Sequence, residues 1–209
     1  MKGNEIYHQN KYSLSNIANI QTSTIIPKFT TAYELLEDKF SIEISKNKKK
    51  KIIELTLGDK VCFVKPHTDD LVCDTIVRGH LPKRHNGLES STVYVLVTDN
   101  KYDFYNIVEI ANTKYQILDR VLENVIVKRI FTIYQLAESL IIDLEKDITK
   151  YKSKLVILTG NFFLYSDAQT AKEDRDWLYS QMIKAITKIK DSIVLVFSPI
   201  KLPGLINYK

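Results

Sequence analysis

The chain has 209 residues, 44% hydrophobic and 26% charged, a composition that is ordinary for a globular protein with one sizeable α/β core. It contains no run of about 18 apolar residues, and residues 1–12 are polar, so we expect neither a membrane span nor a secretory signal. The formal net charge of +5 is compatible with an anionic partner without identifying one. The two cysteines, Cys62 and Cys73, lack metal-ligand spacing, so we expect buried thiols in a cytoplasmic protein, or a nuclear one if the source is eukaryotic.

The N-terminal part differs from the remainder in its low apolar content. Residues 1–28 are polar with isolated isoleucines, and we expect an arm or edge segment that is ordered by docking. Thr30 or Thr31 can cap a short helix that contains Leu35 and Leu36. We therefore divide the chain into an arm, 1–28, and a core domain, 29–209.

Two stretches with alternating apolar residues, 40–44 and 53–57, predict a β hairpin. Five lysines lie at and around its tip: Lys46, Lys48, Lys49, Lys50 and Lys51. They could bind a phosphate backbone, because neutralising phosphates releases counterions. They could equally form a solvated tip that protects an exposed strand pair from aggregation.

The rest of the core alternates between buried strands and amphipathic helices. The expected strands are 61–64, 93–97, 125–131, 155–158 and 193–197, and the expected helices begin near Asp69, Tyr105, Thr132 and Ala171. This alternation predicts an α/β fold: a mostly parallel sheet of about five strands with helices on both faces.

The segment between strand 61–64 and the following helix has the position of a P-loop without its residues. No glycine occurs between Gly58 and Gly79, and Asp69 and Asp70 stand where the phosphate-binding lysine and the magnesium-binding hydroxyl are required. Because carboxylates repel a triphosphate, we expect no bound nucleotide and no cofactor. As alternatives, Asp69 and Asp70 merely cap the helix, or together with Asp99 they hold magnesium and support phosphodiester hydrolysis.

An ordered series of short stretches resembles the ATPase core of the RecA family, specifically the branch of archaeal RadA, the eukaryotic recombinases and their paralogues. The resemblance covers roughly residues 29–200 and rests on 29–32 with 35–36, 71–73, 80–82, 97–99, 124–131 and 134–136. It implies a RecA-like core, which the chain's end at Lys209 would truncate before the family's second DNA-binding loop. Thr159 stands where the Walker B aspartate would be, and Ser198 to Ile200 lack the polar sensor.

The resemblance therefore implies a recombinase paralogue with dead ATPase motifs. Such a protein would bind DNA, in particular single-stranded or branched DNA, and would assist or regulate homologous recombination and DNA repair. Its partners would be a recombinase or another paralogue, in a homo- or hetero-oligomer and without a membrane. The first alternative is a protein-interaction subunit that never contacts DNA, and the second is a metal-dependent nuclease.

Further candidate contacts are scattered along the chain. Lys83 and Arg84 lie in a basic turn, and Phe162 and Phe163 lie where the family's first DNA-binding loop begins, close in sequence to Lys172 and Arg175. Aromatic rings can stack on single-stranded bases, although apolar clusters more often pack in cores or interfaces. Phe29 and Ala32 fit the Phe-x-x-Ala pattern through which RadA-type subunits dock onto a neighbour.

Overall fold

The computed structural model describes residues 39–46, 49–64, 69–99, 102–160, 170–199, 201–202 and 204–208. The predicted arm, the short helix near Thr30 and the docking residues Phe29 and Ala32 lie outside this part. The strands are β1 (Phe40–Lys46), β2 (Lys49–Leu55), β3 (Lys60–Val64), β4 (Thr92–Val97), β5 (Val125–Arg129), β6 (Ser153–Thr159), β7 (Ile193–Ser198) and β8 (Ile206–Tyr208). The α-helices are α1 (Asp69–Gly79), α2 (Phe104–Glu109), α3 (Leu118–Asn124), α4 (Ile133–Glu138), α5 (Leu144–Tyr151) and α6 (Lys172–Lys188).

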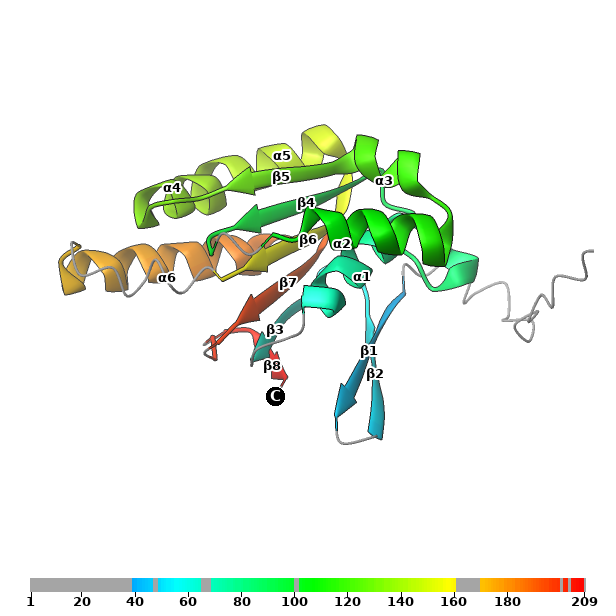
Figure 1. Cartoon of the computed structure of the whole chain (residues 1–209). Coiled ribbons are helices and arrows are strands. Elements are labelled where there is room, and N and C mark those ends of the chain that lie inside the picture. Colours follow the sequence, from blue (N-terminus) through cyan, green and yellow to red (C-terminus); the bar gives the residue numbers. More distant parts are fainter. Residues whose placement is uncertain are drawn as a thin grey trace, which may run out of the picture.

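Six strands form one parallel sheet in the order β5-β4-β6-β7-β3-β8, and β1 pairs with β2 in a separate antiparallel hairpin (Figure 1). The predicted α/β class, the mostly parallel sheet and the N-terminal hairpin are confirmed, and this architecture is consistent with a RecA-like core. The sequence did not reveal the sixth strand, β8, because Ile206–Tyr208 is too short to show a period. The predicted strand 125–131 ends at Arg129.

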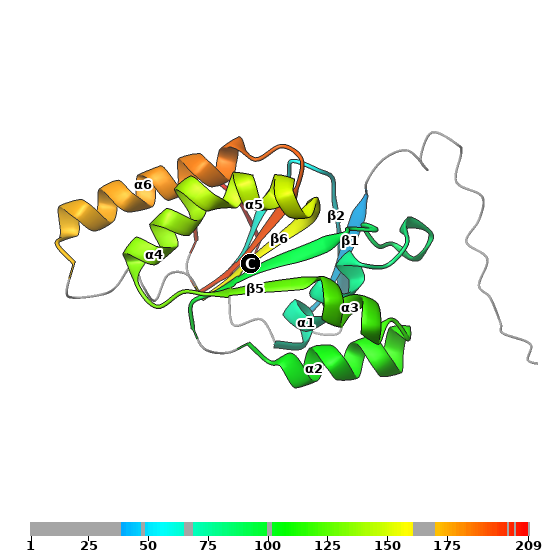
Figure 2. The ribbon, with the colours of Figure 1, turned by 90° about the horizontal axis from the view of Figure 1, so that it is seen from above.

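Helices cover both faces of the sheet (Figure 2). Consecutive residues of each central strand enter different core layers. Tyr94, Leu96, Val156 and Leu158 pack in the layer that contains α4, α5 and α6. Their neighbours Val93, Val95, Leu155 and Ile157 pack in the layer that contains α1, α2, α3 and the hairpin. Because parallel strands are buried on both faces, they appear in the sequence as continuous apolar runs.

The predicted helix beginning near Thr132 is confirmed, including its cap. The Thr132 hydroxyl accepts a hydrogen bond from the Gln135 backbone N–H at 3.1 Å, and the Gln135 side chain accepts one from the Phe131 N–H at 3.0 Å. Between α4 and α5 the helix contains a π-helical segment, η4 (Ser139–Asp143). A second π-helical segment, η3 (Ile110–Tyr115), continues α2.

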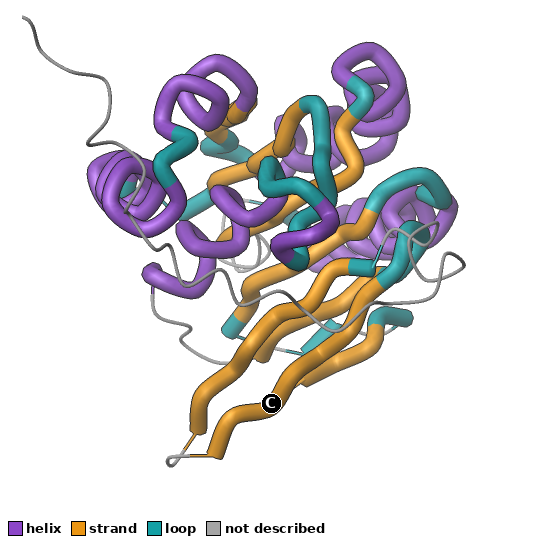
Figure 3. Tube along the Cα trace, turned by 90° about the vertical axis from the view of Figure 1, so that its right-hand side faces the viewer, coloured by secondary structure: helices purple, strands orange, loops and turns teal. Residues whose placement is uncertain are grey.

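The six strands of the parallel sheet begin at one edge of the sheet, called the amino edge, and end at the other, the carboxyl edge. Figure 3 shows the strands in orange side by side, with the helices in purple. Two buried serines, Ser153 and Ser192, link the starts of neighbouring strands at the amino edge. The Ser153 hydroxyl donates to the Thr92 carbonyl at 3.1 Å, and the Ser192 hydroxyl donates to the Ser153 carbonyl at 2.6 Å. The Gly58 N–H donates to the Ser192 carbonyl at 3.2 Å. These bonds link the starts of β4, β6 and β7 to the turn before β3 and satisfy backbone groups that are shielded from water.

Candidate functional site

The carboxyl edge next to β3 is the position at which the sequence suggests a degenerate nucleotide site. Helix α1 begins at Asp69, as predicted, while residues 65–68 and the Asp69 side chain lie outside the described part. The exposed Asp70 carboxylate accepts a hydrogen bond from the Asn106 side-chain amide at 2.8 Å. The Asn106 backbone N–H donates to the Asp103 carboxylate at 3.0 Å, which caps α2. Asn106 thus connects the starts of α1 and α2, because it donates one hydrogen bond to Asp70 and one to Asp103.

Asp99 and Gly160 lie in contact where β4 and β6 end. A Cβ atom on Gly160 would come within 2.4 Å of the Asp99 Cγ atom, and Gly160 has a φ of +62°. Thr159, which stands at the Walker B position, is paired in register with Val97 and Phe197. The Thr159 carbonyl accepts a hydrogen bond from the Thr98 hydroxyl at 2.9 Å. This part of the edge is therefore closely packed around one carboxylate.

The carboxyl edge carries acidic side chains and one half-buried aromatic side chain, Tyr102. Burial raises the pKa of Tyr102 to about 12, Cys73 acts in the same direction, and Arg129 acts in the opposite direction. The Cys73 thiol donates to the Asp103 carbonyl at 3.6 Å. Across the described residues, no group of three His, Cys, Asp or Glu side chains is placed to hold a metal ion. The described side chains therefore form no ligand cluster that would support the alternative of a magnesium-dependent nuclease.

The amino edge carries the predicted basic turn and the base of the lysine-bearing hairpin, and Arg78 connects them. The Arg78 guanidinium lies 5.4 Å from the centroid of the Phe40 ring at the base of the hairpin. The same guanidinium donates to the Asn86 carbonyl at 3.1 Å. Asn86 ends the 3₁₀ turn η2 (Lys83–His85), in which Lys83 is half-exposed and Arg84 is exposed. The structure therefore brings the hairpin base and the basic turn to one place.

The lysine run lies mostly on the strands of the hairpin, which reach further toward the tip than predicted. Lys46 pairs with Lys49, and Lys50 pairs with Ser45. Of the five lysines, only Lys51 has a described side chain; it is exposed and pairs with Ile44. The second strand runs over Lys49–Leu55 and not over the predicted 53–57.

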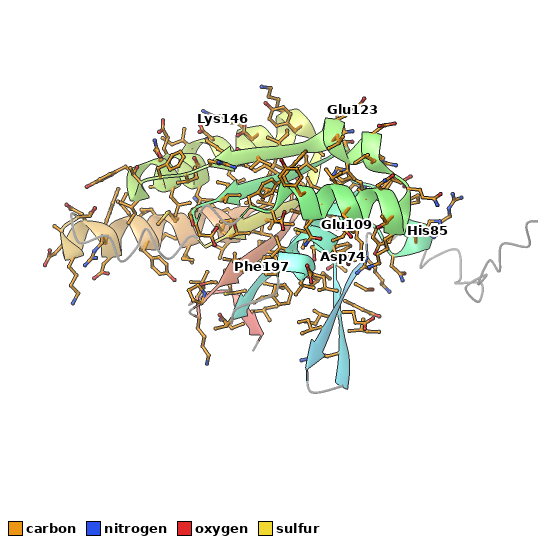
Figure 4. All side chains as sticks on the ribbon, in the orientation of Figure 1. Asp74, His85, Glu109, Glu123, Lys146 and Phe197 are labelled. Atoms are coloured by element: carbon orange, nitrogen blue, oxygen red, sulfur yellow. The ribbon has the colours of Figure 1, made fainter. Side chains whose placement is uncertain are left out.

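Two further predicted contacts, Lys172 and Arg175, lie at the opposite edge. Lys172 is exposed at the first residue of α6, and Arg175 is half-exposed one turn later. Both follow β6 in the chain and therefore lie toward its carboxyl end, while Phe162 and Phe163 are outside the described part. Figure 4 labels His85 of η2 and Phe197 near the end of β7, which mark the two edges. The sequence-predicted DNA contacts are thus split between opposite ends of the strands.

Arg78, Asn106 and a group of exposed apolar side chains were not predicted. Arg78 looks like an ordinary basic residue in the last turn of a helix, and only the docking of the hairpin gives it a role. Exposed apolar side chains occur on edge strand β5 and on the segments that precede and follow it in the chain: Leu122, Val127, Phe131, Tyr134, Ile141 and Ile142. The exposure of Val127 fits the position of β5 as the last strand of the sheet, which the sequence does not specify.

No protein-family model matches the chain, and no curated protein matches it. None of the described helices is long and apolar enough to cross a lipid bilayer.

Proposed function

We propose that this chain is a RecA-like protein without ATPase activity that binds DNA, in particular single-stranded DNA, as an accessory factor in homologous recombination and repair. The observation that carries the proposal is the hydrogen bond from Asn106 to Asp70 at the start of α1. In a nucleotide-binding α/β fold, the helix after the first buried strand directs its free N–H groups at phosphate. Here a carboxylate is held at that helix start.

The charges at the carboxyl edge support the loss of nucleotide binding. Asp70, Asp99 and Asp103 follow or adjoin the strand ends where a ligand of an α/β sheet usually binds. A polyphosphate placed there would meet several carboxylates, and each like charge weakens its binding. ATP–magnesium should therefore leave the melting temperature unchanged, because a ligand that does not bind the folded state does not stabilise it.

DNA binding is supported by the basic segments and the overall positive charge. The net charge of +5 is accompanied by exposed Lys51 and Arg84 on described surfaces. Binding through lysine and arginine would be largely independent of sequence and would weaken steeply with salt. Such contacts suit an accessory protein that follows a DNA strand without reading its bases.

The proposal is tested by fluorescence anisotropy with labelled single-stranded, duplex and branched DNA across a salt series, with and without ATP–magnesium. We expect ATP-independent binding with a steep salt slope, which is lost when Lys48–Lys51 are replaced by glutamate. Absence of binding even at low salt would refute the DNA-binding function.

A second candidate function is that of a protein-interaction subunit, which is favoured by the exposed apolar side chains along β5. An edge strand with exposed apolar neighbours is a common docking surface for another chain. Under this hypothesis, reversing the charge of Lys48–Lys51 would leave function intact. Sedimentation velocity would show an association that Phe131→Ser and Tyr134→Ser weaken.

A further inference from the structure

The two edges of the sheet differ in the charges that they offer to a polyanion. Resting on the proposed DNA-binding function, we infer that the DNA strand binds at the amino edge, along a path from Lys51 of the hairpin past Arg78 to Arg84 of η2. The carboxyl edge, where the predicted contacts Lys172 and Arg175 lie, is not the contact surface. The ligand class is a sugar–phosphate backbone.

The amino-edge path is built on contacts that join three elements. Arg78 stacks on Phe40 of β1 at 5.4 Å and donates to the Asn86 carbonyl at 3.1 Å. These contacts fix the base of the hairpin and the basic turn η2 on either side of one arginine. A DNA strand that followed the path would meet positive charge from the hairpin, from the last turn of α1 and from η2.

The hairpin has two chemically different faces, and only one suits phosphate. Because strand residues alternate between faces, the pairs Phe40–Leu55, Ile42–Ile53 and Ile44–Lys51 share the inward face, whose first two pairs are buried against the core. The pair Lys46–Lys49 has the same parity in the register. The outward face carries exposed Glu43, Glu54 and Ile52. Lys51 is therefore an exposed cation on the inward face, beyond its packed base.

Among the described side chains, the carboxyl edge carries several carboxylates, with Arg129 at the end of β5 as a neighbouring cation. Asp70 and Asp103 stand at the starts of α1 and α2, Asp99 lies against Gly160, and Glu173 and Asp174 occupy the first turn of α6. Helix N-termini attract anions, but acidic side chains in the first turn already offset the partial positive charge of the helix N-terminus. Lys172 stands directly beside these carboxylates in the sequence, so its charge is offset locally. A DNA strand would be drawn to the amino edge in preference.

The test compares charge reversals of equal size at the two edges. Lys51→Glu and Arg84→Glu change the amino edge, and Lys172→Glu changes the carboxyl edge by the same two charge units. Labelled single-stranded DNA of one sequence is titrated by anisotropy across a salt series. We expect each amino-edge variant to weaken binding about fivefold or more and to lower the salt slope by roughly one, the change expected for one lost phosphate contact. Lys172→Glu should remain within about twofold of the wild type by the same reasoning.

A compensated variant separates the location of a charge from net charge. Lys51→Glu/Glu54→Lys restores the wild-type net charge but places the lysine on the outward face. We expect it to bind as weakly as Lys51→Glu, and recovery of wild-type affinity would overturn the assignment of the inward face. Circular dichroism melting of every variant controls for unfolding.

The outcomes distinguish this inference from the function on which it rests. If the wild type binds DNA but Lys172→Glu weakens binding as much as the amino-edge variants or more, the amino-edge path is wrong and DNA binding stands. If the wild type binds no DNA at low salt, the proposed function itself fails.

Discussion

Arg78 holds the base of the hairpin by placing its guanidinium 5.4 Å from the centroid of the Phe40 ring. Phe40 is fully buried, so the contact excludes water from one face of the cation and is stronger than an exposed one. Within the described residues, neither strand of the hairpin pairs with the six-stranded sheet. Its attachment depends on this contact and on the apolar side chains at its base.

Replacing Arg78 by glutamine should loosen the hairpin before it unfolds the core. We expect a loss of about 1–2 kcal/mol in the free energy of unfolding, from the cation–π contact and the hydrogen bond to Asn86. Hydrogen exchange should increase most over Phe40–Leu55. Arg78→Lys retains the charge but not the planar group, and should lose only part of the stability. Unchanged exchange in the hairpin of Arg78→Gln would contradict this role.

His80 should make the protein less stable as the solution is acidified. Its side chain is fully buried, and neither ring nitrogen has a hydrogen-bond partner in the described part of the chain. Burial lowers the His80 pKa to about 4, the positive charge of Arg120 acts in the same direction, and the nearby Ser90 backbone opposes the shift. Between about pH 6.5 and 4 the unfolded chain binds a proton that the folded chain excludes, so unfolding becomes more favourable as pH falls.

Stability should accordingly be highest above about pH 6.5 and should decrease toward pH 4, by up to about 3 kcal/mol from this one group. The measurement is urea unfolding at a series of pH values. His80→Leu should flatten the dependence in that window, whereas His85→Gln, which changes an exposed histidine, should leave it intact. An identical pH dependence in His80→Leu would exclude His80 as its source.

Gly79 lets the last turn of α1 approach the sheet. A Cβ atom there would lie 2.7 Å from Val93 Cγ2 and 2.8 Å from Leu155 Cδ2, both inside the core. We expect Gly79→Ala to cost about 1–3 kcal/mol through overpacking, although alanine usually stabilises a helix relative to glycine. Thermal unfolding measures the change, and Gly79→Ala/Val93→Ala should show favourable coupling between the two sites. A stabilised Gly79→Ala would refute the close approach.

Gly160 and Asp99 should be energetically coupled. Alanine at position 160 would adopt a φ of +62° and press on the Asp99 carboxylate, so Gly160→Ala should destabilise the chain. In an Asp99→Gly background the steric part disappears, because the Cβ and the carboxylate of Asp99 are both removed, and only the backbone strain, about 1 kcal/mol, remains. A double-mutant cycle on urea unfolding gives the difference. Equal costs in both backgrounds would show that the contact carries no energy.

The sequence was sufficient to predict the architecture because buried parallel strands and capped helices leave local signatures. The runs around Val95, Ile157 and Leu195 are apolar in every position, and Thr132 followed by Gln135 marks a helix start. The hairpin was equally clear from alternation. β8 was missed because its three residues can be recognised as a strand only from their pairing with β3.

The candidate site was predictable only in part, since its geometry depends on contacts between distant segments. Asp70 was singled out from its place in the sequence, but its partner Asn106 lies 36 residues away on another helix. The basic segments were found, yet nothing local showed that Arg78 would join two of them and that Lys172 would lie at the other edge. The RadA-branch resemblance, the DNA contacts and the loss of ATPase activity stay predictions for the experiments above.

The central sheet also separates the two cysteine thiols of the protein. Cys62 packs in the layer of α4, α5 and α6, and Cys73 packs in the layer of α1. Burial, opposed by the Leu202 backbone, raises the pKa of Cys62 to about 11, so this thiol stays protonated and unreactive while its layer is closed. Each thiol can therefore report independently on one side of the molecule. Alkylation that modifies Cys73 before Cys62 would mean that the two halves of the core open at different free energies, and simultaneous modification would mean that they open as one cooperative unit.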